Sequence, residues 1–287
     1  MTRRIGGRAR AAGAAGTAGA AIGAVACVAA WLAAAPAGAG LPASVDAAGP
    51  PRFGTVVIDA GHGGGDDGAS GPAGLLEKDL VLDVAERLAA RLRADGLDVV
   101  LTRADDEFVA LDERTRLANE AGADLFISIH ANASTFHGVR GIETFFASPE
   151  ATDDAARELA HAENLAFGSA AAKVSQGDPL LAILGDMLAN EYLTASQEFA
   201  RIAQRRIAQA EEARSRGVKQ APFVVLMGVR MPAVLVEIGF LTNGGDARAL
   251  AGQAERDRLA QGLAEAVASF RERQDARLGV TGAGGGR

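Results

Sequence analysis

Alternating strand and helix patterns run through the middle of the chain. The apolar run Thr55–Asp59 predicts a buried strand, because β-branched residues pack well on a pleated sheet. After Glu77, leucines and valines recur at four-residue spacing and predict a helix that ends near Gly96. Leu97–Thr102 predicts a second strand. A strand, a helix and a strand in this order form a βαβ unit, which requires a parallel sheet.

The remaining pattern predicts an α/β fold. We expect a mostly parallel sheet of about six strands with helices on both faces. A Thr194-x-x-Gln197 capping box predicts the start of one long helix. The further predicted strands are Asp124–His130, Gly141–Ala147, Phe223–Met227 and Ala233–Ile238, and the further predicted helices are Leu111–Ala121, Thr194 to about Ala213, and Ala254–Arg271.

Residues 149–193 interrupt this rhythm and predict a helical insertion. We expect its first helix over Asp153–Phe167. A second helix is signalled by Asp178 as N-cap and Pro179 as the first helical residue. Its apolar residues form a broad surface, here called the insertion apolar surface, made of Leu180, Leu184, Met187 and Leu188. Either both helices pack on the sheet, or the insertion has a function of its own.

Both ends of the chain differ in composition from the middle. Residues 1–10 hold four arginines and no acid, residues 11–35 are uncharged and rich in Ala and Gly, and small residues follow. This pattern predicts a signal peptide over residues 1–39 and export to the periplasm or cell wall, although an uncleaved membrane anchor is the alternative. Residues 40–53 predict a linker, residues 54–273 one folded domain, and the Gly-rich residues 274–287 a flexible tail.

Composition and charge narrow the possible functions. The chain of 287 residues has a formal net charge of −7, which argues against a nucleic-acid partner because such proteins present a basic face. Its single cysteine, Cys27, lies inside the predicted signal peptide. A metal site in the mature chain must therefore use His and carboxylate ligands.

Three residues near predicted strand ends have the chemistry of such a site. His62 lies in a Gly-rich turn just after the first strand, where open α/β sheets place their ligands. Glu77 begins the next helix, and His130 ends the third strand. Two His and one carboxylate are a ligand set of hydrolytic zinc sites. Each His could instead be a hydrogen-bonded structural residue, but two at neighbouring strand ends favour the zinc site.

Glu237 is the one charged residue in the apolar run Val234–Phe240. A buried carboxylate without a partner is costly, so it must be paired, protonated or used in chemistry. One interpretation is a structural salt bridge with Arg103 or Arg114. The other is a general base beside a metal ion.

Several motifs together resemble the zinc-dependent N-acetylmuramoyl-L-alanine amidases of bacterial cell-wall turnover. They follow the family's order over about residues 54–270, and together they are highly specific. The chain has Ala60 where proline is common before the Gly-His pair. The motifs are IDAGHGG (58–64), EKDLVLDVA (77–85), TR (102–103), SIHANA (128–133), GIETFF (141–146) and PAVLVEIGFLTN (232–243).

This resemblance implies a function for the folded domain. It implies hydrolysis of the amide between N-acetylmuramic acid and L-Ala of peptidoglycan stem peptides. A zinc carboxypeptidase acting on wall peptides and a non-catalytic peptidoglycan-binding protein remain as alternatives. The implied roles are zinc ligands for His62, Glu77 and His130, catalytic acid/base for Glu237, and orienting or substrate-contacting roles for Asn132 and Arg103.

The insertion resembles the one in division-associated members of this family, where a helix covers the zinc and an activator displaces it. The resemblance implies autoinhibition, with Glu163 in the position that water and substrate need. The insertion apolar surface would then dock a protein activator, because helix-in-groove contacts use such spaced apolar anchors.

Overall fold

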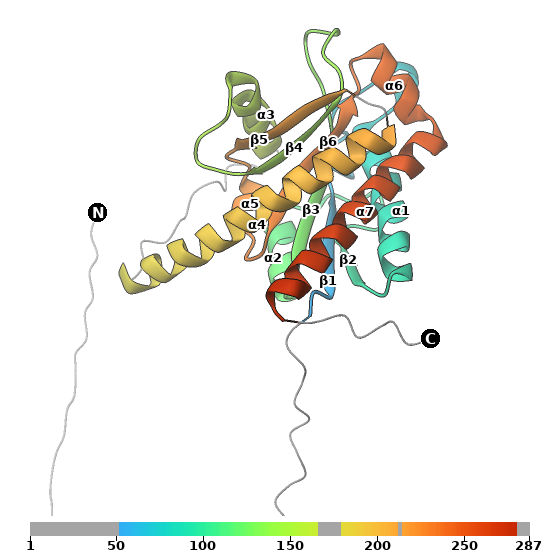
Figure 1. Cartoon of the computed structure of the whole chain (residues 1–287). Coiled ribbons are helices and arrows are strands. Elements are labelled where there is room, and N and C mark those ends of the chain that lie inside the picture. The colour runs from blue at the N-terminus through green and yellow to red at the C-terminus, as the bar shows by residue number, and fades with distance from the viewer. Residues whose placement is uncertain (1–51, 166–178, 212–213, 280–287) are drawn as a thin grey trace, which may run out of the picture. The chain divides into compact units, whose positions relative to one another are not determined.

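The computed structural model describes residues 52–165, 179–211 and 214–279, and this part of the chain contains one six-stranded sheet. Its strands are β1 (Thr55–Ala60), β2 (Asp98–Leu101), β3 (Leu125–Asn132), β4 (Ile142–Ala147), β5 (Ser215–Ala221) and β6 (Ala233–Phe240). They lie in the order β2-β1-β3-β6-β4-β5 (Figure 1). Neighbouring strands are parallel except β4 and β6, which are antiparallel. The predicted mostly parallel sheet is confirmed.

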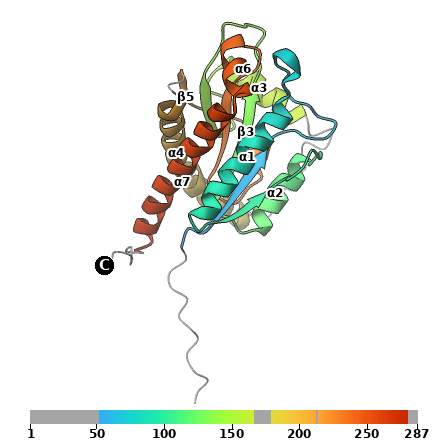
Figure 2. The same ribbon diagram turned by 90° about the vertical axis from the view of Figure 1, so that its right-hand side faces the viewer.

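Helices cover both faces of the sheet, as predicted (Figures 1 and 2). One face packs against α1 (Glu77–Ala94), α4 (Pro179–Glu211) and α7 (Gln253–Arg277). The other packs against α2 (Leu111–Glu120), α3 (Asp154–Leu165) and the short α5 (Val224–Met227). A short 3-10 helix (Pro72–Gly74) and α6 (Gly244–Ala251) complete the described elements.

Strand residues alternate between these two cores. On β1, Val56 and Ile58 face the α1 side and Val57 faces the α2 side, all without solvent exposure. On α1, the apolar stripe Leu80, Val84, Leu88 and Leu92 is buried against the first core, as its spacing predicts. The alternation follows from the two-residue period of a strand and fixes which side chains reach each face.

The connections around β1 place the functional edge of the sheet. The chain leaves β1, forms α1 and returns as β2 on one side of β1, and then crosses to β3 on the other side. Ligands of open α/β sheets bind at the carboxyl ends of strands where the connections diverge in this way. The turn after β1 and the end of β3 therefore meet at one edge.

The predicted strand Phe223–Met227 is wrong, because Val224–Met227 forms the helix α5. Val225 and Leu226 are buried, and a short apolar run fits a buried helix as well as a strand. The strand that the prediction missed is β5, whose sequence SRGVKQA is mostly polar. It lies at the edge of the sheet, where side chains are partly exposed, so its sequence lacks the apolar run that predicts a buried strand.

The predicted helix start at Thr194 is also wrong. The helix α4 is continuous from Pro179 to Glu211, so Thr194 lies inside it. The residues from Pro179 to Thr194 are mostly good helix formers without a further proline, and nothing local ends the helix there. Its second half belongs to the main core through Phe199, Ala203 and Ile207 rather than to an insertion.

The folded domain also extends beyond its predicted boundaries at both ends. Phe53, assigned to the linker, is buried and packs against Phe270 with ring centroids 5.9 Å apart. The closing helix α7 runs to Arg277 instead of Arg271, so residues 274–277 are not part of a flexible tail. Arg273 and Arg277 both pair with Glu198 of α4, which stabilises this extension.

Some predictions fall outside the described residues. These are the signal peptide over residues 1–39, most of the linker, the N-cap Asp178, residues 280–287, and the side chains of the insertion apolar surface. Within the described part of the chain, no helix combines the length and the apolar character that crossing a membrane requires.

Candidate metal centre and adjoining groove

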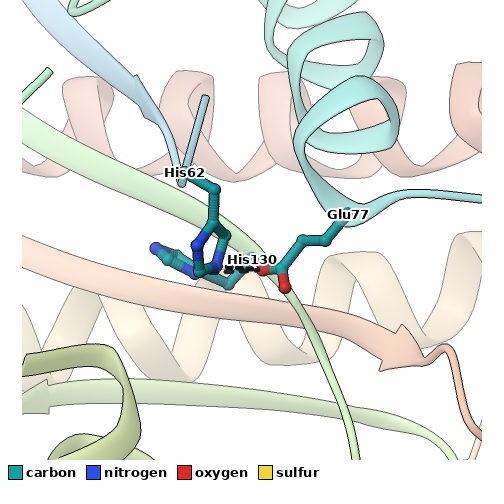
Figure 3. Close-up of side chains that lie close together, drawn as sticks. All are labelled: His62, Glu77 and His130. Carbon is teal, nitrogen blue, oxygen red and sulfur yellow. Dashed lines mark hydrogen bonds and ion pairs between the residues drawn. The ribbon is translucent and has the colours of Figure 1, made fainter. Parts of the chain in front are cut away.

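Three polar side chains converge at the carboxyl edge of the sheet (Figure 3). His62 comes from the turn after β1, Glu77 from the first residue of α1 and His130 from β3. Glu77 Oε1 lies 3.0 Å from His62 Nε2 and 3.1 Å from His130 Nδ1. One ligand atom from each residue lies within 4.8 Å of the others, so the trio has the spacing of a metal site. The structure thus brings together the predicted ligand set.

The turn that carries His62 is held in an unusual conformation. His62 has φ of +58°, and among the described non-glycine residues it alone has a positive φ. Arg114 donates to the His62 carbonyl at 2.7 Å, and Arg103 donates to the carbonyls of Ala60 and Gly61 at 3.0 and 2.8 Å. Backbone strain of this kind persists only where the surroundings enforce it. Two buried guanidinium groups supply that enforcement here.

Close approach of the backbone explains two glycines of the turn. A Cβ on Gly61 would lie 2.4 Å from the His130 ring. A Cβ on Gly68, which has φ of +64°, would lie 2.5 Å from Glu77 Oε2. Any side chain at either position would push a member of the trio out of place.

Glu77 is fixed by further contacts besides the two imidazoles. Its Oε2 accepts the Ala69 N–H at 2.7 Å, and its Oε1 accepts the Ala131 N–H at 2.9 Å. Burial opposes a charged carboxylate, but hydrogen bonds and charge from His130 and His62 outweigh it and lower the pKa of Glu77. This shift favours the ionised form of Glu77, which is the form that can bind a metal ion.

Asp66 is a site residue that the sequence reasoning missed. Its Oδ2 lies 2.9 Å from His62 Nδ1, and its Oδ1 accepts the Gly68 N–H at 3.1 Å. A carboxylate on the far nitrogen of an imidazole fixes the ring orientation, and here Nε2 faces Glu77 Oε1. The available signal was an acidic residue four positions after His62 in the same Gly-rich turn.

Glu237 lies beside this trio on β6, as the Cα partner of His130 on β3. Its side chain is 1% exposed, and neither carboxylate oxygen has a hydrogen-bond partner among the described residues. Burial, together with nearby carboxylates, raises the pKa of Glu237 well above its ordinary value. The alternative of a salt bridge is wrong, because Arg114 pairs with Asp59 and Arg103 donates to backbone carbonyls.

Comparison with known proteins decides the family. The family model described as N-acetylmuramoyl-L-alanine amidase matches residues 56–269. The chain belongs to this family. It is 38% identical over 217 residues to the amidase AmiA of Escherichia coli K12, covering 75% of each protein. It is 36% identical to the amidase LytC of Bacillus subtilis 168, covering 75% of this chain and 35% of LytC.

Solved structures agree with this assignment. The N-acetylmuramoyl-L-alanine amidase of Clostridium difficile 630 superposes with a TM-score of 0.60 and 30% identity, covering 77% of this chain and 98% of that one. The protein is therefore an amidase whose substrate is peptidoglycan, and the carboxypeptidase and non-catalytic alternatives lose their support.

Helix α3 places an additional carboxylate at the amidase's trio. Glu163 Oε2 lies 3.1 Å from His130 Nδ1 and 3.5 Å from His62 Nε2. It also lies within 4.8 Å of ligand atoms of His130 and Glu237. The next residue, Asn164, anchors the helix by donating to Pro222 O at 2.8 Å and accepting the Val224 N–H at 2.9 Å. The predicted helix of the insertion thus reaches the site.

A groove of about 580 Å³ extends from the amidase's trio. We call it the α3 groove, since α3 forms one wall, while the segment after His130 and residues of β4 and β5 form the others. Asn132 lines it at the end of β3, whereas Arg103 is buried and bonds to backbone carbonyls. Arg103 is therefore placed to orient the His62 turn rather than to contact substrate.

Proposed function

We propose that the protein is a zinc-dependent amidase in which His62, Glu77 and His130 hold the metal. The observation that carries this proposal is the buried Nε2 of His62, which faces Glu77 Oε1 at 3.0 Å without the geometry of a hydrogen bond, while Asp66 orients the ring. An imidazole nitrogen kept from water in this way fits a metal bond. Two imidazoles and one carboxylate suit zinc and leave one coordination position open for chemistry.

A zinc ion held there would polarise the scissile carbonyl and acidify a water molecule. Glu237 has no hydrogen-bond partner among the described residues, and a zinc ion beside it would favour its ionised form, which would accept a proton from the attacking water. The water oxygen adds to the lactyl carbonyl carbon, and the carbon–nitrogen bond to L-Ala breaks. Glu237 then returns the proton to the departing amine. The products are a lactyl carboxylate and a stem peptide with a free amino terminus.

Metal analysis of variants tests the ligand set. We expect one zinc per chain in protein purified without chelator, and loss of zinc and activity in His130→Ala. His137→Ala is the matched control, because His137 is exposed on a nearby loop and its ring contacts the Thr242 carbonyl rather than the trio. Full zinc occupancy and full activity in His130→Ala would rule out this centre.

We further propose that α3 is an autoinhibitory element. Glu163 lies where substrate and water must approach the trio, and Asn164 fixes the helix in that position. A carboxylate bound to the metal excludes the hydrolytic water and the scissile carbonyl from the same place. Displacement of α3 would then switch the enzyme on.

The Glu163→Ala variant should hydrolyse purified sacculi severalfold faster than the parent, at equal zinc content. Glu158→Ala is the control, because Glu158 is on the same helix and lines the α3 groove but is not part of the metal cluster. Equal stimulation by both variants would indicate a general charge effect in the groove. Rates unchanged from the parent in Glu163→Ala would reject autoinhibition.

Docking of a protein activator on the insertion apolar surface remains part of the same proposal. That surface precedes the part of α4 whose side chains are described, and it follows α3 in the chain. Export to the periplasm or cell wall likewise remains a proposal, supported by the peptidoglycan substrate of the family. Fractionation of cells that produce the full chain, with N-terminal sequencing of the mature product, tests export. Unprocessed protein confined to the cytoplasm would reject it.

A further inference from the structure

Arg216 on the edge strand β5 has no role in the metal centre, yet it lines the α3 groove. It is the one arginine or lysine among the described residues of the groove wall. The acids of that wall are Glu77, Glu143, Glu158 and Glu163. A single cation in a groove that is otherwise acidic is a point where an anionic group of a ligand is favoured.

The guanidinium group of Arg216 is held in place from two sides. Its Nε donates to Glu143 Oε1, and its Cζ lies 5.3 Å from the centroid of the Phe240 ring. In the described structure its Nη1 and Nη2 donate to no protein group, and the side chain is 25% exposed. The two-nitrogen edge that binds carboxylates in a fork is therefore free and already oriented.

Glu143 does not cancel the charge of Arg216. Its Oε1 also lies 3.0 Å from Lys219 Nζ, so one buried carboxylate is shared by two cations. Lys219 Nζ also lies 3.0 Å from Asp153 Oδ2, just before α3. Lys219 does not line the groove, so Arg216 is the cation of the groove wall. Charge-assisted hydrogen bonds to such a group are about twice as strong as neutral ones.

The sheet register sets the separation between Arg216 and the proposed acid/base. Glu143 on β4 is the direct cross-strand partner of Glu237 on β6, so both side chains lie on one face. Arg216 lies on β5, the next strand beyond β4, and bonds to Glu143 across that pair. With strands about 4.8 Å apart, the backbone of Arg216 is two strand spacings, about 10 Å, from that of Glu237.

A stem peptide that carries a free α-carboxylate on the residue after L-Ala would present it at a matching separation. An extended chain advances about 3.5 Å per residue, so this carboxylate lies roughly 7 Å from the scissile amide. An arginine side chain spans the remaining distance.

We propose that Arg216 binds the α-carboxylate of the second stem-peptide residue and so aligns the amide with the metal centre. This inference rests on the proposed amidase function and adds a specificity-determining residue to it. Amidation of the same carboxylate removes the charge that Arg216 recognises, so the enzyme discriminates between amidated and free stem peptides.

The test uses two soluble disaccharide muropeptides that differ only at the second residue, D-Glu or D-isoglutamine. The kcat/KM of the full mature chain should favour the D-Glu substrate by roughly 10- to 100-fold, the range of a hydrogen bond between charged groups. In Arg216→Met the preference should fall to about twofold or less, because the KM of the D-Glu substrate rises. Because both substrates meet the same protein, any occlusion by α3 cancels in the ratio.

Two further variants sharpen the result. Arg140→Ala removes an exposed arginine just before β4 that does not line the groove, and it should keep the full preference. Arg216→Lys keeps the charge but not the fork, so it should restore part of the preference. Glu143 retains Lys219 in both Arg216 variants, so the fold tolerates them.

The outcomes separate this inference from the function on which it rests. Equal cleavage of both substrates by the parent, or an equal loss for both in Arg216→Met, overturns the role of Arg216 while leaving the amidase function intact. Failure of zinc-loaded parent and Glu163→Ala proteins to cleave either muropeptide overturns the amidase function itself, and this inference with it.

Discussion

Two buried acids on the two strands that flank β3 differ in almost every contact. Asp59 on β1 accepts hydrogen bonds at 2.7 Å from Arg114, Thr102 and Ser128. Glu237 on β6 is equally buried, and neither of its oxygens has a hydrogen-bond partner among the described residues. One carboxylate is fully satisfied by its surroundings, and the other is left without compensation.

The pKa shifts of these two acids point in opposite directions. Burial opposes ionisation of Asp59, but Arg114 and two hydroxyl groups outweigh burial and lower its pKa. Burial raises the pKa of Glu237 without sufficient opposition. Removing one partner of a buried ion pair strongly destabilises a fold, whereas a buried carboxyl group with a raised pKa and no partner is typical of functional sites. The comparison predicts that replacing Asp59 costs stability and that replacing Glu237 costs activity.

The largest effect is expected from Glu237→Gln. The amide preserves the shape of the side chain but cannot accept a proton, so kcat on sacculi should fall by about 100- to 10,000-fold. Urea unfolding should show no loss of stability, since no hydrogen bond is broken. Elemental analysis should show unchanged zinc. Near-normal turnover, or a large loss of stability, would make Glu237 a structural residue like Asp59.

Replacing Asp59 should have the second-largest effect. Asp59→Asn leaves the buried Arg114 without its counter-charge, so the free energy of unfolding should fall by about 3–5 kcal/mol. The control is Asp83→Asn, which removes a half-exposed acid that pairs with Arg87 and Arg256 and should cost at most about 1 kcal/mol. An equal loss of unfolding free energy in both variants would show that burial does not distinguish the Asp59 pair from the Asp83 pairs.

Low pH should remove the stabilisation that the ionised Asp59 carboxylate gives to the parent protein. Because the pKa of Asp59 is lower in the fold than its ordinary 3.8, the parent is stabilised above that value and loses the stabilisation as pH falls through the folded pKa. The difference in unfolding free energy between parent and Asp59→Asn should stay constant from about pH 5 to 8 and shrink below about pH 4. A difference that grows on acidification contradicts the assigned charge state.

The smallest effect is expected from Ser128→Ala. It removes one of the three hydrogen bonds to Asp59 and should lower the free energy of unfolding by about 1–3 kcal/mol, less than Asp59→Asn. Ser269→Ala provides the control, since its hydroxyl is exposed on α7. If Ser128→Ala were neutral in urea unfolding, the Arg114 pair alone would hold Asp59.

Local patterns in the sequence predicted much of the fold and the composition of the candidate site. Five strands were predictable because their apolar runs are bounded by turn residues, namely β1, β2, β3, β4 and β6. Helix α1 was predictable because its apolar stripe is continuous. The trio His62, Glu77 and His130 could be named from motifs, and the structure brings its members together. Their zinc-binding role stays a prediction.

Other features could not be predicted because their signals are not local. The edge strand β5 has a polar sequence, and α5 has an apolar sequence that suits either structure. With β5 missed, Arg216 had no place in the site. Asp66 was missed because an acid in a Gly-rich turn is ordinary until its contact with His62 is seen.

The sequence by itself determined the alternation of elements, the set of candidate ligands and the presence of a lone acid in the apolar run of β6. These depend on residues near one another in the chain, whose period and turn chemistry can be read directly. Only the tertiary structure decided which buried acid has hydrogen-bond partners and that Glu163 reaches the trio. It also decided that Arg216 bonds to Glu143 at the wall of the α3 groove. Those contacts join strands and helices that are distant in sequence, and burial and charge compensation exist only once the sheet has assembled.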